Sequence, residues 1–181
     1  MPRLLDTADR ADAVAAAVAR IIAGRGVAAL TVRAIGAEAG ISPASLLQHL
    51  GSKQHVLQIS GHLWVRAWAQ QRASRSWVEG TAAFLPPTED DLNETRVWCG
   101  LHEIGRTHPG VGLALCRDAE VERALLDRVT GEVHTGDGLD ALLALVHGLR
   151  LAVCALEEPM ALSHAVALLE QQATAPVTSA S

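Results

Sequence analysis

The segment LTVRAIGAEAGISPASLLQHLGSK, residues 30–53, constrains the fold of this chain more than any other. Thr31 is a suitable N-cap for a short helix that ends at Gly40, because its hydroxyl can accept a hydrogen bond from an unpaired backbone N–H. Ser42 is a suitable cap for a second helix, and Pro43 stands at its first position, where the missing N–H costs nothing. Two helices of about eight residues joined by a short glycine turn predict a helix-turn-helix.

The composition predicts an all-α fold for the whole chain. Ala and Leu occur 32 and 25 times among the 181 residues, whereas Tyr is absent and Phe occurs once. Ala and Leu lead the scale of helix propensity, while strands draw on aromatic and β-branched residues. The composition therefore argues against an all-β fold, and against an RNA-binding sheet that stacks bases on exposed Phe or Tyr.

Helix signals recur along the rest of the chain, and eight or nine helices are expected. The first, over about 12–23, carries Val14, Val18, Ile21 and Ile22 at helical spacing. Further helices are expected from Ser52 to about Glu79, from Thr88 through Ile104, from the His108-Pro109-Gly110 turn to about Val129, from Asp137 to Leu156 and from Pro159 to about Gln172.

The net charge of −5 is unevenly distributed along the chain. Residues 1–55 hold six Lys and Arg against four Asp and Glu, whereas residues 56–181 hold nine against sixteen. The N-terminal part is thus weakly basic and the remainder is acidic. Such an asymmetry is typical of a nucleic-acid-binding end joined to an acidic body.

The second helix of the helix-turn-helix is predicted to read DNA bases. If Leu46 and Leu50 face the core, short or amide side chains face outward, as a helix in the major groove requires. Gln48 would pair with an adenine edge, Ser45 with either base type and Ala44 with a thymine methyl. Phosphate contacts are expected from Thr31, His49 and Lys53, the last aided by the positive end of its own helix.

A family resemblance covers residues 12–57, in order and without gaps. It is carried by Gly26, Leu30-Thr31-Val32, Ile35, Glu38-Ala39-Gly40-Ile41-Ser42, Ser45-Leu46, His49-Leu50, Ser52-Lys53 and Val56-Leu57. The segment resembles the DNA-binding domain of the TetR family of transcriptional regulators. Leu47, also on the outward face, stands where the family usually has Tyr, and Leu50 where it usually has Phe. The resemblance implies that Arg33, on the supporting helix, reaches a guanine or a phosphate.

The resemblance also implies a domain organisation and a function. We expect a DNA-binding domain over 1–55, a helical effector-binding and dimerisation domain over 56–175, and a flexible tail over 176–181. The implied function is a homodimeric repressor that a small molecule releases from its DNA operator. In such a dimer the two DNA-reading domains must lie about one helical turn of DNA apart, ~34–36 Å, or a multiple of it.

Large aromatic side chains gather on two predicted helices. Trp64 and Trp68 are four residues apart on one, and Trp98 and His102 repeat that spacing on the next. By resemblance they line an apolar ligand pocket, although ordinary core packing is the alternative. The expected effector is apolar and either uncharged or weakly cationic, since indole offers the best face for a cation. The expected pocket residues are Trp64, Trp68, Phe84, Trp98, Cys99 and His102.

The last two predicted helices carry apolar stripes that predict a subunit interface. The stripes are more apolar than a monomer of this size leaves exposed, which favours a dimer packed as a four-helix bundle. TetR-family relatives dimerise through this region; the alternative is that the stripes close the subunit's own core. The stripe residues are Leu142, Leu145, Val146, Leu149, Val153, Ala161, Ala165 and Leu168.

No metal, cofactor or catalytic site is expected. The eight His residues lack HxxxH and HExxH spacing, no CxxC occurs, and no G-x-S-x-G surrounds a serine. Three widely spaced cysteines indicate reduced thiols in a cytoplasm, and neither a signal peptide nor a membrane span is expected. Two alternatives stay open: a small-molecule-binding protein whose DNA-binding domain has degenerated, and an α-helical enzyme.

Overall fold

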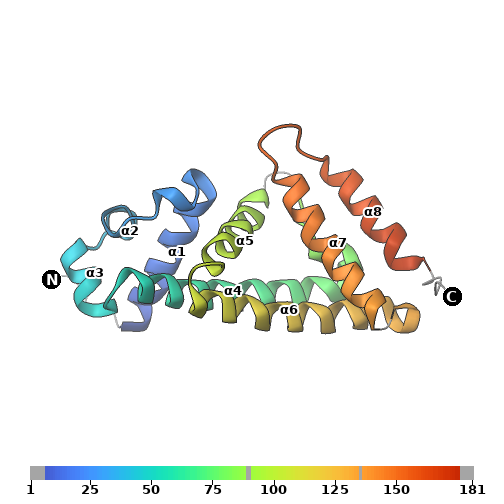
Figure 1. Cartoon of the computed structure of the whole chain (residues 1–181), viewed down its shortest axis with the longest axis horizontal. Helices are drawn as coiled ribbons and strands as arrows, with labels where there is room; N and C mark the ends of the chain where they lie inside the picture. Colours follow the sequence, from blue (N-terminus) through green and yellow to red (C-terminus); the bar gives the residue numbers. More distant parts are fainter. Residues whose placement is uncertain (1–6, 89–90, 135, 176–181) are drawn as a thin grey trace. The chain divides into compact units, whose positions relative to one another are not determined.

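The computed structural model describes residues 7–88, 91–134 and 136–175, and within these ranges it contains eight α-helices and no strand (Figure 1). The all-α fold predicted from the composition is confirmed. The helices are α1 (Thr7–Arg25), α2 (Val32–Ala39), α3 (Pro43–Leu50), α4 (Lys53–Glu79), α5 (Leu92–Gly105), α6 (Pro109–Thr130), α7 (Asp137–Val153) and α8 (Leu162–Thr174). The predicted tail over 176–181 lies outside the described residues.

Three predicted helix starts differ from the observed ones, the first being that of α1, which begins at Thr7 and not at about residue 12. The Thr88 hydroxyl does not cap α5: it donates to the Asp91 carboxylate at 2.6 Å, and α5 begins only at Leu92. The last helix begins at Leu162 and not at Pro159. Glu158 has a φ of 50°, outside the right-handed region, and a residue before proline avoids the helical conformation.

The described chain divides into two compact units. The first unit comprises the residues up to Ala67 together with Arg96–Cys116, and the second comprises Trp68–Thr95 together with the residues from Arg117 onward. Helices α4, α5 and α6 therefore each contribute to both units. The domain boundary expected at residue 55 stays a prediction.

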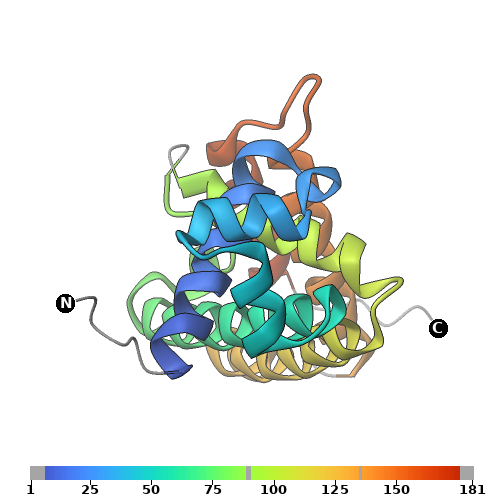
Figure 2. The same cartoon turned by 90° about the vertical axis from the view of Figure 1, so that its left-hand side faces the viewer.

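The core of the first unit is built on the stripe predicted for α1. Val14, Val18, Ile21 and Ile22 are all buried there. Apolar residues from α2, α3, α4, α5 and α6 complete this core. Helix α1 contacts α2 and α2 contacts α3, and Figure 2 shows the three lying close together in blue and cyan. The three N-terminal helices thus share one apolar interior.

The core of the second unit contains most of the predicted dimer stripe. Five of its eight residues are buried within this unit, and Leu145 and Leu168 pack partly buried against them, while Ala161 is exposed. These side chains contact residues of their own subunit, as the alternative of closing the subunit's core requires. The role of this stripe as a subunit interface stays a prediction. The buried five are Leu142, Val146, Leu149, Val153 and Ala165.

Candidate functional site

The helix-turn-helix is held by the side chains that the sequence predicts as caps. The Thr31 hydroxyl accepts a hydrogen bond from the Ala34 N–H at 3.0 Å, and the Ser42 hydroxyl accepts one from the Ser45 N–H at 3.1 Å. Between the helices, Gly40 adopts the left-handed conformation, with φ of 68° and ψ of 26°. A residue with a Cβ is strained in that region, so glycine permits the turn.

Gly36 sets how closely the turn approaches α2. The Ile41 N–H donates to the Gly36 carbonyl at 2.8 Å, and a Cβ built on Gly36 would lie 2.6 Å from the Ile41 carbonyl oxygen. A side chain at this position would therefore push the turn away from α2. Sequence analysis overlooked Gly36, although a glycine inside a helix costs about 1 kcal/mol and so calls for a packing reason.

An ion pair links α1 to α2 on the surface of the first unit. The Arg20 guanidinium lies 2.7 Å from the Glu38 carboxylate and also donates to the Glu38 backbone carbonyl at 3.2 Å. Arg25 approaches the same carboxylate at 3.6 Å. Side chains this exposed contribute little to stability, but the bonds orient the end of α2 that precedes the turn.

The predicted DNA-reading side chains lie on one side of α3. Leu46 and Leu50 are buried in the first unit, which leaves the outward face as predicted. Ser45 is half-buried, and Leu47 is 41% exposed. The Thr31 hydroxyl uses a lone pair to cap α2, so its proton remains available to a phosphate. The exposed members of the predicted set are Thr31, Arg33, Ala44, Leu47, Gln48, His49 and Lys53.

An open hollow of about 320 Å³ lies beside the first turn of α4 in the first unit. Lys53 and Arg106 both line it and are both exposed, while Leu30 and Ile104 form part of its apolar wall. Glu103 at the same hollow offsets part of this positive charge. Arg106 is thus a candidate phosphate contact beside Lys53. Sequence analysis did not assign it to DNA, because it lies over fifty residues from the helix-turn-helix.

The six residues predicted for the ligand pocket are divided between the two units. Trp64, Trp98, Cys99 and His102 belong to the first unit, and Trp68 and Phe84 to the second. The rings of Trp98 and His102 are in contact, with centroids 3.8 Å apart and planes tilted by 40°, and the His102 ring nitrogen Nδ1 lies 3.0 Å from the Trp98 carbonyl. Phe84 is buried in the core of the second unit. Their common pocket stays a prediction.

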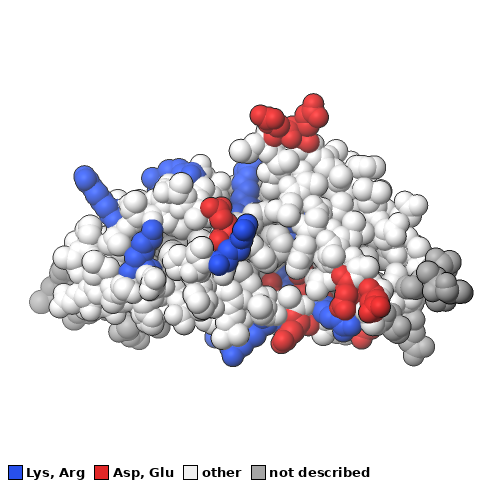
Figure 3. Space-filling view, in the orientation of Figure 1, with Lys and Arg blue, Asp and Glu red and all other residues white. Residues whose placement is uncertain are grey.

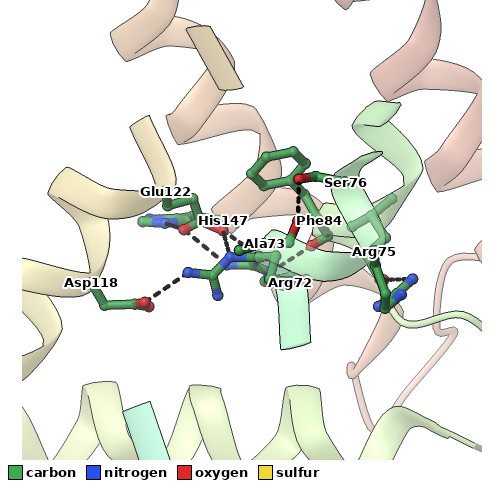
Figure 4. A network of polar contacts seen from close by, with 10 residues as sticks. Arg72, Ala73, Arg75, Ser76, Phe84, Asp118, Glu122 and His147 are labelled. Carbon is green, nitrogen blue, oxygen red and sulfur yellow. Dashed lines mark hydrogen bonds and ion pairs between the residues drawn. The ribbon is translucent and has the colours of Figure 1, made fainter. Parts of the chain in front are cut away.

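A buried network of charges joins α4, α6 and α7 in the second unit (Figure 4). Arg72 on α4 lies 2.7 Å from Asp118 and 3.3 Å from Glu122, both on α6, and all three side chains are at most 2% exposed. Arg150 on α7 donates to both carboxylate oxygens of Glu122, and His147 lies 3.0 Å from the same group. The backbone carbonyl of Phe84, the last residue of the short 3-10 helix η2 (Gly80–Phe84), accepts a hydrogen bond from the Arg150 Nε at 2.9 Å.

The pKa values of the two carboxyl groups in this network are shifted in opposite directions. Burial raises the pKa of Asp118, and the attraction of Arg72 offsets this only in part. Burial acts on Glu122 as well, but the charges of Arg150 and Arg72 and the hydrogen bond from His147 outweigh it, so the pKa of Glu122 is lowered. Glu122 is therefore the firmly ionised centre of the network.

Trp68 lies against the cationic side of this network. Its ring centroid is 5.5 Å from the Arg72 guanidinium carbon and 5.3 Å from that of Arg150, within the range of cation–π attraction. A narrow pocket of the second unit is lined by Trp68 and Arg72 and also by Leu85, Glu94 and Thr95, among others. Sequence analysis assigned Trp68 to a ligand pocket but missed these charged and polar neighbours.

The outward face of α7 is uncharged along most of its length. Its exposed positions recur three or four residues apart and carry Ala141, Ala144, Gly148, Leu151 and, just beyond the helix, Ala155. In Figure 3 the surface over α7 and α8 is white between the acidic group over the loop that joins them and the charged side chains at the lower end of α7. This face differs from the buried stripe that the sequence predicts as an interface.

The described residues hold neither a cluster of metal-binding side chains nor a membrane-spanning helix. Within the described ranges, His, Cys, Asp and Glu side chains nowhere gather in threes as metal ligands would. No described helix is both long enough and apolar enough to cross a membrane.

The segment that contains the helix-turn-helix matches a known family model. The family model for bacterial regulatory proteins of the tetR family matches residues 14–58, which include α2, α3 and the turn between them. This confirms the resemblance carried by the same segment. A comparison with curated protein sequences finds no match.

Solved structures resemble nearly the whole chain. A transcriptional regulator from Rhodococcus sp. Rha1 has a TM-score of 0.74 and 22% identity, with 90% of this chain and 93% of that one covered. A regulator from Saccharomonospora viridis, in complex with choline, has a TM-score of 0.71 and 18% identity, with 91% and 95% covered. The multidrug binding protein EbrR, complexed with ethidium, has a TM-score of 0.63 and 19% identity, with 90% and 98% covered.

Proposed function

We propose that this chain is a TetR-family transcriptional regulator, and that it is a dimeric repressor that a small molecule releases from its operator. The observation that carries the proposal is the exposed face of α3, where Ala44 and Gln48 stand outward from a helix capped by Ser42. Short and amide side chains at this end suit a helix in the major groove. Such a protein acts on DNA, so we place it in the cytoplasm.

Base recognition is assigned to α3 and phosphate contact to its surroundings. Gln48 pairs with an adenine edge, and Arg33 on α2 binds a guanine or a phosphate. Thr31, His49 and Lys53 bind phosphates, with Lys53 placed in the first turn of α4, where the helix dipole favours an anion. Arg106, which lines the same hollow as Lys53, extends this set.

A small-molecule effector acts through the second unit. The S. viridis regulator holds choline and EbrR holds ethidium, which supports a small organic ligand for this chain as well. Helix α4 contains both Lys53 and Arg72 and runs without a break between them. A ligand that binds one position of α4 better than another shifts the population toward the state it prefers.

A second copy of the chain pairs through the outward face of α7. Ala144 and Gly148 are small and exposed, so they allow two helices to approach closely, and Leu151 supplies an apolar contact beside them. A dimer is required by the proposal because two recognition helices at matched spacing bind a pseudo-palindromic operator.

The decisive experiment is DNA binding by the purified full-length chain. Fluorescence anisotropy is measured with fragments from around the protein's own gene and with random fragments of equal length, over a range of salt concentrations. We expect tighter binding to one fragment and a steep decrease of affinity with salt. Equal affinity for all fragments at every salt concentration would refute the proposal.

One observation favours a second candidate, a small-molecule-binding protein without operator specificity. Leu47 exposes an apolar side chain on the face assigned to DNA, where the family usually has a hydroxyl-bearing Tyr. The same experiment separates the two candidates, because the second predicts only weak, sequence-independent binding. Substituting Leu47→Tyr would then increase DNA affinity by adding a phosphate contact.

A further inference from the structure

The buried polar atoms of the second unit that lack a hydrogen-bond partner include two donors on side chains that line one pocket. They are the Nη1 of Arg72 and the Oγ1 of Thr95, and neither has a partner among the described residues. Arg72 is 2% exposed and Thr95 is fully buried. The other Arg72 nitrogens face Asp118 and Glu122, at 2.7 Å and 3.3 Å (Figure 4). A buried donor without a partner costs about 1–3 kcal/mol, so such groups call for an explanation.

Both groups belong to side chains that line one narrow pocket. Its free volume is about 10 Å³, which is room for one atom of the size of a water oxygen. Trp68 and Leu85 supply apolar wall, and the exposed Gln71 marks the side open to solvent. Because Arg72 and Thr95 both line this space, an acceptor atom held in it would lie beside both side chains, while the rest of the molecule would extend toward the exposed Gln71.

The charges around the pocket are already balanced. Arg72 and Arg150 face the carboxylates of Asp118 and Glu122 in the buried network. An anion would add an uncompensated charge near this network, at a large desolvation cost. A cation at Trp68 would be repelled by the two guanidinium groups that already lie 5.5 Å and 5.3 Å from that ring.

The charged side chains at the mouth of the pocket do not change this balance in favour of an anion. Arg75, which lines the pocket, is paired with Glu79 at 2.6 Å and also donates to the Leu85 carbonyl. Glu94, half-buried at the same pocket, adds negative charge. An uncharged acceptor is therefore favoured over a carboxylate.

We propose that this pocket binds the carbonyl oxygen of an uncharged, otherwise apolar molecule, such as a ketone, ester or amide, with Arg72 Nη1 and Thr95 Oγ1 as the two donors. A carbonyl oxygen has two lone pairs and accepts both hydrogen bonds at once. The inference names the chemical class of the effector and so rests on the proposed function for its regulatory consequence. The binding itself is tested without DNA.

The test uses acetophenone as the probe and two variants of Thr95. Thr95→Val keeps the shape and removes the hydroxyl; Thr95→Ser keeps the hydroxyl and removes the methyl. Calorimetric titration of the full chain is expected to show acetophenone binding about tenfold weaker in Thr95→Val and within about threefold of wild type in Thr95→Ser, as loss of one hydrogen bond predicts. Ethylbenzene, which lacks the oxygen, binds all three proteins alike, and benzoate binds more weakly than acetophenone.

A matched control and a stability measurement separate binding from folding. Thr130→Val also removes a hydroxyl of the second unit, but one that donates to the Leu126 carbonyl at 2.9 Å and does not line the pocket, so acetophenone binding stays unchanged. Thr95→Val is expected to melt at or above the wild-type temperature, because it removes an unsatisfied buried group. Acetophenone binding no tighter than ethylbenzene in the wild type, or equal in wild type and Thr95→Val, overturns the inference.

The regulatory consequence is read separately from binding. If the titrations follow the expected pattern but acetophenone leaves DNA affinity unchanged, the carbonyl-binding pocket is supported and its role in regulation is refuted. If acetophenone releases DNA equally from wild type and Thr95→Val, regulation by a small molecule is supported and its binding at the Thr95 pocket is refuted.

Discussion

The Arg72 guanidinium and the Asp118 carboxylate lie 2.7 Å apart in the interior of the second unit, although 46 residues separate them in the chain. The contact joins α4 to α6, and through Glu122 and Arg150 the same network reaches α7. Removing one partner of such a buried pair leaves a charge without compensation, which is strongly destabilising. The network therefore fixes how three helices pack and makes stability depend on the ionisation of its carboxylates.

The stability that Glu122 contributes is expected to vanish in acid. Its pKa is lower in the folded chain than its ordinary value of 4.5, so the contribution is complete above that value and is lost as the pH falls below it. Glu122→Gln should lower the free energy of unfolding by about 3–5 kcal/mol at pH 7. The difference between wild type and variant should shrink by about 1.4 kcal/mol for each pH unit below 4.5.

Urea unfolding of both proteins at pH 7, 4 and 3 measures this difference. The pKa of Asp118 is raised on folding, so Asp118 changes the pH dependence of the free energy of unfolding in the opposite direction. Because Asp118 is present in both proteins, its effect largely cancels in the difference between them. If Glu122→Gln proves too unstable at pH 7, wild-type stability should still fall as the pH is lowered from 4.5. A difference that is independent of pH would contradict the ionised state assigned to Glu122.

DNA recognition should separate into a base-specific and a general component. Gln48→Ala is expected to weaken operator binding by about 1–3 kcal/mol and to relax the preference at one base pair, because it removes a contact to a base edge. Lys53→Ala should weaken binding to all sequences alike and lower the salt slope by about one unit. Anisotropy with single-base operator variants measures both; an unchanged preference in Gln48→Ala would reassign the recognition helix.

Gly36→Ala is expected to disrupt the helix-turn-helix. The added Cβ would meet the Ile41 carbonyl oxygen at 2.6 Å, so the turn must move, at a cost of about 1–3 kcal/mol. The matched control is Gly24→Ala in α1, where nothing lies within 4 Å of the new Cβ and the helix gains about 0.5–1 kcal/mol. In thermal unfolding, Gly36→Ala should melt below the wild-type temperature and Gly24→Ala should melt above it. In the DNA-binding measurement, only Gly36→Ala should lose affinity.

Dimerisation should depend on the outward face of α7 and not on its buried face. Ala144→Glu places a charge on the exposed face and is expected to give folded monomers at micromolar concentration, because an unpaired carboxylate at an apolar contact is unfavourable. Ala124→Glu, at an exposed position of α6, serves as the control and should leave the oligomeric state unchanged. Sedimentation equilibrium and circular dichroism distinguish dissociation from unfolding.

Leu149→Glu tests the buried stripe in the same measurements. Since Leu149 is 4% exposed and lies in the core of the second unit, this variant should unfold instead of dissociating into folded monomers. A stable folded monomer from Leu149→Glu, together with a stable dimer from Ala144→Glu, would show that the interface is the stripe that includes Leu149 and not the outward face of α7.

The sequence by itself determined the local structure of the helix-turn-helix. Thr31, Gly40 and Ser42 act on backbone groups within four residues of themselves, so their types and spacing were sufficient to predict both caps and the turn. The stripe on α1 was equally predictable, because helical periodicity identifies an apolar face without reference to its partner. The family resemblance covers this same segment.

Only the tertiary structure decided which partner each apolar or charged face meets. Periodicity identified the stripe that includes Val146 and Leu149, but a buried core and a subunit interface require the same residue types, so the pattern could not distinguish them. The partners of Arg72 lie 46 and 50 residues away on another helix, and no local spacing encodes such a pair. The polar pocket at Thr95 arises from that packing, because burial without a partner is a property of the folded neighbourhood and not of the residue.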